Sequence, residues 1–404
     1  MAKSGSSFLL AARRCEIREL EQLALTGELV RVVGRFIHAL QKERGLSIVF
    51  LASRGTRFGD QRLRQMAECE LLEQDLRTQF DTLDTASAGV RNGARLFSRI
   101  AVVLHAVDAL QALRQRIGAQ ALPTEDASAP IVRLIAGLLG VVFEAADGAT
   151  NPEISRALVA MFNFMQGKEF AGQERAFGAA AFASGHTDAA HQQQWMHLIA
   201  LQERCFEVFT DFSGTGMLQA WRQHQVGESL LEIERLRRIG CALNAGGTPN
   251  TQRSSVWFDA CTHRIDAMKI LEDLLATDLG ILCQRKISEA RNDMRDQQAL
   301  LDSLARQVNA DSDAPARYGP QFERSMMDLM QEQARRLQAM GYELETVRAA
   351  LNERKVVERA KGLLMASRKL TEDEAYNLLR QTAMNQNRRL LDVAEAVLAM
   401  SDFL

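Results

Sequence analysis

Residues that interrupt helices are scarce in this chain of 404 residues. Only six prolines occur, and long stretches contain neither a proline nor a cluster of glycines. β-Branched and aromatic residues are also sparse, whereas Ala, Leu, Glu, Gln and Arg dominate, and these residues lose least on entering a helix. The composition therefore predicts an all-α protein.

The chain lacks an excess of charge of one sign and lacks closely spaced cysteines. The 49 basic and 51 acidic residues give a formal net charge of −2, which argues against a protein that coats nucleic acid non-specifically but allows a local basic patch. The six cysteines form no C-x-x-C pair. We interpret them as reduced thiols, mostly in the core, in a reducing compartment.

Membrane-targeting segments are also missing. The N-terminal apolar run, residues 8–12, is too short for the core of a signal peptide. The longest apolar stretch, residues 131–146, contains Arg133 and Glu144 and is shorter than the roughly 20 residues that a membrane span needs. We therefore expect no membrane contact and a cytoplasmic location.

Motifs for catalysis or metal binding are not found. The seven histidines include no H-E-x-x-H and no pair at one-face metal spacing, and no phosphate-binding glycine loop follows a strand. We predict no catalytic residue, no metal ligand and no cofactor, and we do not expect an enzyme.

What the sequence does contain is helical periodicity. Along residues 13–53 apolar residues recur at three- and four-residue steps, which predicts one long amphipathic helix. Similar stretches cover residues 60–83, 91–117, 130–146, 151–183, 187–211, 217–241 and 253–307. Long helices with short connections favour helix bundles, and we expect two four-helix bundles.

A polar segment with two prolines, residues 309–320, is the clearest boundary. Residues 326–351 then carry a heptad pattern, which indicates either a short coiled coil or a single amphipathic helix packed on the rest of the chain. From residue 356 the pattern predicts three short helices, and Thr371 with Glu374 forms a capping box at the second. The predicted domains are residues 13–308, a linker and coiled-coil-like helix at 309–341, and a three-helix domain at 342–404.

The C-terminal residues 342–404 carry four characteristic blocks. These are VERAKGLLM (357–365), TEDEAYNLLR (371–380), AM (383–384) and RRLLDVA (388–394). The segment resembles the ANTAR domain, a family of transcription antitermination regulators that bind RNA. The resemblance implies binding to paired hairpins in a leader mRNA, which favours the antiterminator over the terminator. It also implies dimers formed through the preceding helix, so residues 322–354 are one dimer interface that the pattern allows.

The charges of this segment support RNA binding only in part. Residues 343–404 contain ten basic and ten acidic side chains, but several basic residues can gather near one face. Hairpin loops are recognised through bases and phosphates, which calls for a few Arg or Lys and for small residues that let the RNA backbone approach. The candidate RNA-binding residues are Lys361, Gly362, Arg380, Ala383, Arg388 and Arg389. The small residues are equally explained as helix-packing positions.

Three segments of the N-terminal region resemble nitrate- and nitrite-sensing (NIT) domains. Residues 38–55 (HALQKERGLSIVFLASRG) are similar to the start of that domain, residues 168–185 (KEFAGQERAFGAAAFASG) to its middle, and residues 257–279 to its end. A NIT sensor followed by an ANTAR output resembles the NasR-type nitrate- and nitrite-responsive antiterminators. The resemblance implies nitrate or nitrite as the effector and a nitrate-assimilation operon as the target.

The NIT-like region also contains an internal repeat. Glu43-Arg44 is followed by Ala52-Ser53 at the spacing with which Ala183-Ser184 follow Glu174-Arg175. Adjacent residues on a helix do not face each other, so each Arg can point away from its neighbouring Glu. Two related halves in matching orientation could aim both arginines at one site.

The chemistry of arginine suits nitrate. Nitrate is a planar, weakly hydrated monoanion, and a guanidinium can bind it bidentately, whereas Lys acts only as a point charge. The candidate ligand-binding residues are Arg44, Arg175, Ser47 and Gly45, with Arg54 and Arg235 as further candidates. The alternative for these arginines is pairing with carboxylates across helix contacts.

The predicted function is a ligand-gated RNA-binding switch. Two other interpretations stay open at this point. One is a helical adaptor that recruits a protein partner, with RNA binding incidental. The other is an antiterminator that responds to a different small ligand.

Overall fold

The computed structural model describes residues 5–83, 93–184, 188–241, 251–310, 320–368, 370, 372–386 and 388–401. Every regular element within these ranges is an α-helix, which confirms the all-α prediction. The chain divides into two compact units, Met1–Met327 and Asp328–Leu404, which are described separately. The two units divide within one continuous helix, so this division does not test the domain limits predicted from the sequence, which stay predictions.

The first unit contains two groups of helices. The first group is α1 (Gly5–Ala52), α2 (Gly59–Asp81), α3 (Gly93–Asp108), α4 (Leu110–Gly118) and α5 (Thr124–Asp147), with α1 packed against α2 and α5, and α3 packed against α5. The second group is α6 (Pro152–Ser184), α7 (Ala189–Phe212), α8 (Thr215–His224), α9 (Glu228–Cys241) and α10 (Thr251–Ala310), with α6 packed against α7 and α10, and α9 against α10.

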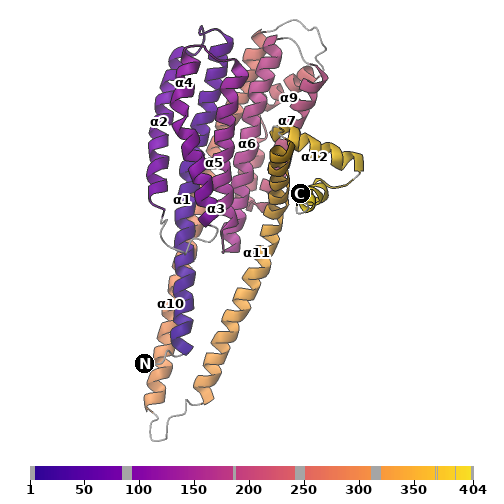
Figure 1. Cartoon of the computed structure of the whole chain (residues 1–404). Coiled ribbons are helices and arrows are strands. Elements are labelled where there is room, and N and C mark those ends of the chain that lie inside the picture. Colours follow the sequence, from indigo (N-terminus) through magenta and orange to yellow (C-terminus); the bar gives the residue numbers. More distant parts are fainter. Residues whose placement is uncertain are drawn as a thin grey trace. The chain divides into compact units, whose positions relative to one another are not determined.

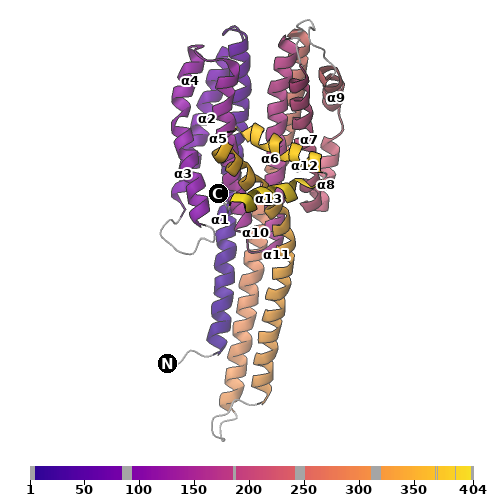
Figure 2. The ribbon, with the colours of Figure 1, turned by 45° about the vertical axis from the view of Figure 1, so that its right-hand side comes forward.

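Both groups follow the same order along the chain: two longer helices, two shorter ones and another long one. The two stretches predicted as single helices, residues 91–117 and 217–241, are therefore each divided, at Ala109 and at residues 225–227. The groups lie side by side (Figures 1 and 2) and meet where α6 contacts α1 and α5 and where α10 contacts α1. The N-terminal part of α1 and the C-terminal part of α10 extend together beyond the other helices of this unit.

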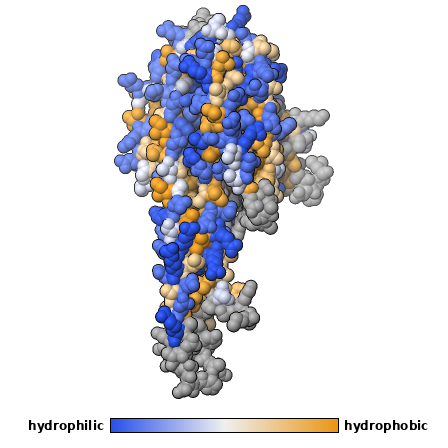
Figure 3. Space-filling view, turned by 90° about the vertical axis from the view of Figure 1, so that its left-hand side faces the viewer, coloured by the Kyte–Doolittle hydropathy of each residue, from blue (hydrophilic) through white to orange (hydrophobic). Residues whose placement is uncertain are grey.

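Two apolar segments of this unit, Gly93–Gly118 and Asp126–Asp147, are long and apolar enough to cross a membrane by length and composition alone. Their apolar side chains, however, include core residues such as Val103, Ile135 and Leu138, each no more than 1% exposed. Hydrophilic side chains cover most of the face in Figure 3, with apolar ones scattered between them. We interpret Asp126–Asp147 as a core helix and the first segment, which is divided at Ala109, as two helices whose buried faces pack within this unit.

The second unit is built on α11 (Pro320–Arg368), α12 (Glu372–Gln386) and α13 (Leu390–Ser401). The predicted coiled-coil-like helix and the first helix of the three-helix domain are thus one continuous element. Within it, Leu337 at a heptad position is exposed, so a dimer interface through residues 322–354 stays a prediction. Thr371 of the predicted capping box lies outside the described residues.

Small side chains let the three helices of this second unit approach closely. Its buried core combines residues from the end of α11 with residues from α12 and α13: Ala360, Leu364, Ala375, Leu379, Ala383, Val393 and Ala394. Four of these seven are alanines, which have no side chain beyond Cβ to separate the helix axes.

Candidate functional site

Two buried arginines meet where the first and second helix groups of the N-terminal unit pack together. Arg44 lies on α1 and Arg175 on α6, and they are 1% and 3% exposed. Each guanidinium lies against a glycine of the other helix. A Cβ at Gly45 would be 2.6 Å from Nη2 of Arg175, and a Cβ at Gly172 would be 2.8 Å from Nη2 of Arg44. The structure therefore brings together Arg44, Gly45 and Arg175, as the repeat predicted.

Arg44 is paired with a buried carboxylate on α6. Its two terminal nitrogens donate to Glu169, and the Nη2–Oε2 distance is 3.2 Å. The same carboxylate accepts hydrogen bonds from the side-chain amides of Gln41 and Gln173, at 2.8 and 2.9 Å. The alternative of a carboxylate partner across a helix contact is therefore realised for Arg44.

Arg175 has no carboxylate partner among the residues that the structure describes. Its Nη1 donates to the Thr262 hydroxyl at 2.9 Å and its Nη2 donates to the backbone carbonyl of Gln41 at 3.1 Å. The guanidinium lies over the ring of Phe258, with its Cζ 4.8 Å from the ring centroid. Burial and the nearby charge of Arg44 lower the pKa of Arg175 to about 10. A second positive charge is thus held in the interior with only neutral hydrogen-bond partners.

Ser47 is a third polar group of this region. It lies three residues after Arg44 and six after Gln41, so all three share one face of α1. Its hydroxyl is buried and makes no hydrogen bond within the described part of the chain, and the same holds for Nε of Arg175. A buried polar group without a partner costs about 1–3 kcal/mol, which a polar ligand would remove. Both atoms are donors, so such a ligand should supply acceptors.

The acidic residue before each arginine points the other way. Glu43 accepts two hydrogen bonds of 2.8 Å from Arg114 on α4. In the second group, Glu174 accepts from Arg237 on α9 at 2.7 and 2.6 Å. Burial alone would raise the pKa of Glu174, but the ion pair with Arg237 outweighs it and lowers that pKa. In each half, then, Glu anchors a helix of its own group while Arg faces the other group.

The sequence did not reveal Arg114, Arg237 or Glu169 as partners. The two Glu–Arg pairs join residues 71 and 63 positions apart, and Arg44 and Glu169 are 125 positions apart. No local spacing links such residues, because tertiary packing alone brings their helices together.

Two of the predicted arginines do not join the buried pair. Arg54 is exposed beyond the end of α1. Arg235 has a side chain that is 63% exposed and forms an ion pair with Glu232, one turn earlier on α9. Both were expected to extend the site, but both side chains face solvent and not the buried pair. Arg235 faces solvent, whereas Arg237, two residues along the same helix, faces the core.

The candidate RNA-binding residues fall into two sets. Gly362, Arg388 and Arg389 are exposed and Arg380 is half-buried, so these four reach the surface. A Cβ at Gly362 would meet no heavy atom within 4 Å.

The other two candidates are covered by their own unit. Lys361 is buried, with its Nζ 6.0 Å from the ring centroid of Tyr376. Ala383 belongs to the core between the three helices. The packing interpretation therefore applies to Ala383, because its methyl group fills space between helices and is not on the open surface.

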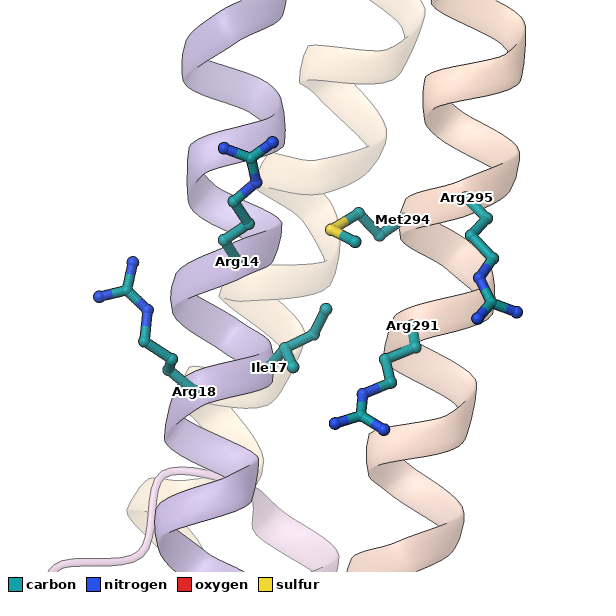
Figure 4. Close-up of a pocket in the computed structure, with 6 residues that line it drawn as sticks. All are labelled: Arg14, Ile17, Arg18, Arg291, Met294 and Arg295. Atoms are coloured by element: carbon teal, nitrogen blue, oxygen red, sulfur yellow. The ribbon is translucent and has the colours of Figure 1, made fainter.

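A second cluster of arginines lies on the outside of the N-terminal unit. Arg14 and Arg18 on α1 and Arg291 and Arg295 on α10 line a shallow pocket with Ile17 and Met294 (Figure 4). All four arginines are exposed, and Arg291 is paired with Glu21 at 2.7 Å. Solvent screens exposed charges, so the buried pair is the stronger site for a small anion.

Comparison with known proteins agrees with this division of the chain. Residues 35–280 match the family described as nitrate and nitrite sensing (NIT), and residues 345–398 match the ANTAR domain family. The chain is 31% identical to a nitrate regulatory protein of Klebsiella oxytoca over 397 residues, covering 96% of this chain and 93% of that protein.

Two further relatives are a solved structure and a shorter match. The structure of the NasR transcription antiterminator covers 98% of both chains, with 30% identity and a TM-score of 0.62. The transcriptional regulatory protein PdtaR of Mycobacterium tuberculosis is 36% identical over 72 residues, which is 18% of this chain and 35% of that protein.

Proposed function

Because the chain belongs to the nitrate- and nitrite-sensing (NIT) family and carries an ANTAR output domain, we propose how this nitrate-responsive antitermination regulator works. Nitrate or nitrite binds between Arg44 and Arg175. Binding of the anion allows the C-terminal domain to bind hairpins in a leader RNA and to prevent the terminator from forming. The regulator acts in the cytoplasm by binding alone and catalyses no reaction.

The observation that carries the proposal is the unbalanced charge of the buried arginine pair. Arg44 and Arg175 contribute two positive charges, and the directly bonded carboxylate of Glu169 contributes one negative charge. Uncompensated charge in the interior is strongly unfavourable. A bound monoanion neutralises the excess, and it gains from the low dielectric of a site that excludes water.

The shape and bonding of the site also suit a small planar oxyanion. The glycines that face the two guanidinium groups leave no room for a larger side chain at either position. Nε of Arg175 and the hydroxyl of Ser47 retain hydrogens for an acceptor. Guanidinium donors in a planar fork match the oxygens of nitrate or nitrite.

Anion binding connects the two helix groups, because Arg44 belongs to α1 and Arg175 to α6. An anion held by both arginines favours arrangements in which these helices stay close. Its effect on RNA binding equals its differential affinity for the two arrangements, typically ~1–3 kcal/mol, and leader RNA must tighten anion binding by the same factor. Residues 309–345 connect the sensor to the RNA-binding domain and are where this signal crosses.

Calorimetry of nitrate and nitrite tests the anion site. The wild type should bind, Arg175→Ala should show no heat of binding, and Arg175→Lys should bind at least ~10-fold more weakly, because Lys keeps the charge but loses the fork. Far-UV circular dichroism checks that the variants stay helical. The site is refuted if the wild type binds neither anion or if Arg175→Ala binds like the wild type.

A gel shift with leader hairpin RNA tests the output. Nitrate-dependent retardation is expected for the regulator. Indifference to RNA at every nitrate concentration would instead favour the helical adaptor.

A further inference from the structure

We propose that Glu169 makes the arginine-pair site selective for singly charged oxyanions over doubly charged ones. The inference rests on the proposed anion-binding function and adds the basis of its selectivity. Glu169 is a carboxylate bonded to one of the two arginines of an anion site, a position at which a negative charge weakens the binding of any anion. The net charge of the groups around Glu169 explains why a carboxylate is present there.

Glu169 is a buried carboxylate surrounded by hydrogen-bond donors. It is 2% exposed, and its contacts are the guanidinium of Arg44 and the amide groups of Gln41 and Gln173. All of these are donors, and an ionised carboxylate is an acceptor only. Glu169 thus contributes a full negative charge beside the two arginines.

The other charges packed nearby compensate one another. Lys168 and Lys269 both pair with the buried Glu272, and Lys269 also pairs with Asp273. Two positive charges therefore meet two negative ones. Burial and neighbouring lysines keep the pKa of His38 far below its usual value, so this side chain is neutral.

The pair Lys42 and Asp266 adds no net charge either, with 3.8 Å between Nζ and Oδ1. The net charge left at the site is thus the +1 from Arg44, Arg175 and Glu169.

A net charge of +1 discriminates between anions by their charge. Nitrate or nitrite brings the site to zero. Sulfate would leave an uncompensated negative charge in the interior, next to a carboxylate that cannot move into water without breaking its bonds to Arg44 and Gln41. Specificity through an unfavourable contact with the wrong ligand is an ordinary device of binding sites.

The test compares nitrate and sulfate binding by calorimetry in the wild type and in Glu169→Gln. The wild type should bind nitrate and bind sulfate at least ~100-fold more weakly. Glu169→Gln keeps the size of the side chain but raises the net charge to +2, so the affinity for sulfate relative to nitrate should rise at least ~10-fold.

Glu43→Gln is the matched control. It removes an equally buried carboxylate that is also bonded bidentately to an arginine, but to Arg114 of α4 and not to an arginine of the anion site. Its preference for nitrate should equal that of the wild type. A rise in sulfate affinity in this control as large as in Glu169→Gln would overturn the proposal.

A charge-balanced variant covers the case in which Glu169→Gln does not fold. Combining Glu169→Gln with Arg44→Gln removes the ion pair and leaves +1 on Arg175, so nitrate should stay preferred even if it binds more weakly. A preference of this variant for sulfate would contradict the proposal, as would equal binding of both anions by the wild type. Absence of nitrate binding in the wild type would refute the anion site itself, which is a different result.

Discussion

Replacing Arg237 by alanine, in parallel with Arg235, separates a buried ion pair from an exposed one on the same helix. Both arginines lie on α9 and both pair with a glutamate. Arg237 donates to Glu174, which is 1% exposed, from two guanidinium nitrogens. Arg235 pairs with Glu232 at the surface. The two substitutions remove the same chemical group, but Arg237 is largely covered and reaches a buried carboxylate, whereas Arg235 is exposed.

The magnitudes follow from what each substitution leaves behind. Without Arg237, the carboxylate of Glu174 stays in the core with the neutral donors Trp195 and Gln202, at 3.1 and 2.7 Å, and keeps only the more distant positive charge of Arg264. Breaking a buried pair in this way costs about 3–5 kcal/mol. That is a large share of the ~5–15 kcal/mol by which a folded domain is usually stable. Without Arg235, Glu232 is solvated, so the stability of that variant should equal that of the wild type within error.

The assay is urea denaturation followed by far-UV circular dichroism, with nitrate calorimetry on both variants. Arg235→Ala should keep the stability and the nitrate affinity of the wild type, because Arg235 faces solvent and pairs with Glu232. Equal losses of stability in both variants would refute the reasoning from burial. Loss of nitrate binding in a stable Arg235→Ala would return Arg235 to the anion site.

The ion pair of Glu174 and Arg237 also makes the stability of the folded protein depend on pH. The ion pair lowers the pKa of Glu174 in the folded state, although burial opposes it. Its stabilisation is therefore complete above the unfolded pKa of about 4.3 and is lost as the pH falls through the folded value. Removing Arg237 leaves burial to raise the pKa of Glu174, so the difference in stability between the wild type and Arg237→Ala should shrink as the pH falls and Glu174 becomes protonated in the variant. A difference that stays constant to lower pH would contradict this assignment.

Three further predictions concern other parts of the chain. Burial and nearby lysines keep His38 neutral in the folded state, so stability should fall by up to ~1.4 kcal/mol per unit as the pH drops below about 6.5. His38→Asn should remove that slope from urea denaturation, and an unchanged slope would exclude His38. Arg388→Ala removes an exposed charge of the RNA-binding domain. The slope of log affinity against log salt for leader RNA should then fall by about 1, and an unchanged slope would remove this residue from the interface. Gly240→Ala would place a Cβ 2.2 Å from the Trp195 ring and should cost about 1–3 kcal/mol, whereas Gly280→Ala meets nothing within 4 Å and should stabilise by up to about 1 kcal/mol. Thermal melts of both glycine variants test this, and a shift of the melting temperature in the same direction in both would contradict the packing argument.

Much of the architecture could be predicted from the sequence because it depends on local properties. Helix-forming composition and three- and four-residue periodicity predicted an all-α protein, and the structure confirms it. The repeated Glu-Arg segments indicated that Arg44 and Arg175 could point to one site, since a side chain's face on a helix follows from its position in the sequence. The blocks between residues 357 and 394 identified the RNA-binding family, which the match to the ANTAR domain confirms.

Only the tertiary structure decided which partner each charged side chain takes. Periodicity assigns a residue to a face of its own helix, but it does not say which helix covers that face when the contact spans more than a hundred residues. For this reason the sequence did not identify Glu169 as the partner of Arg44, and it pointed to Arg235 although Arg237 is the arginine of α9 that reaches a buried carboxylate. Lys361 was expected on an RNA-binding surface, yet packing within its own unit covers it. Burial determines whether a charge is solvated, paired or left for a ligand, and burial is a property of the packed helices and not of any one of them.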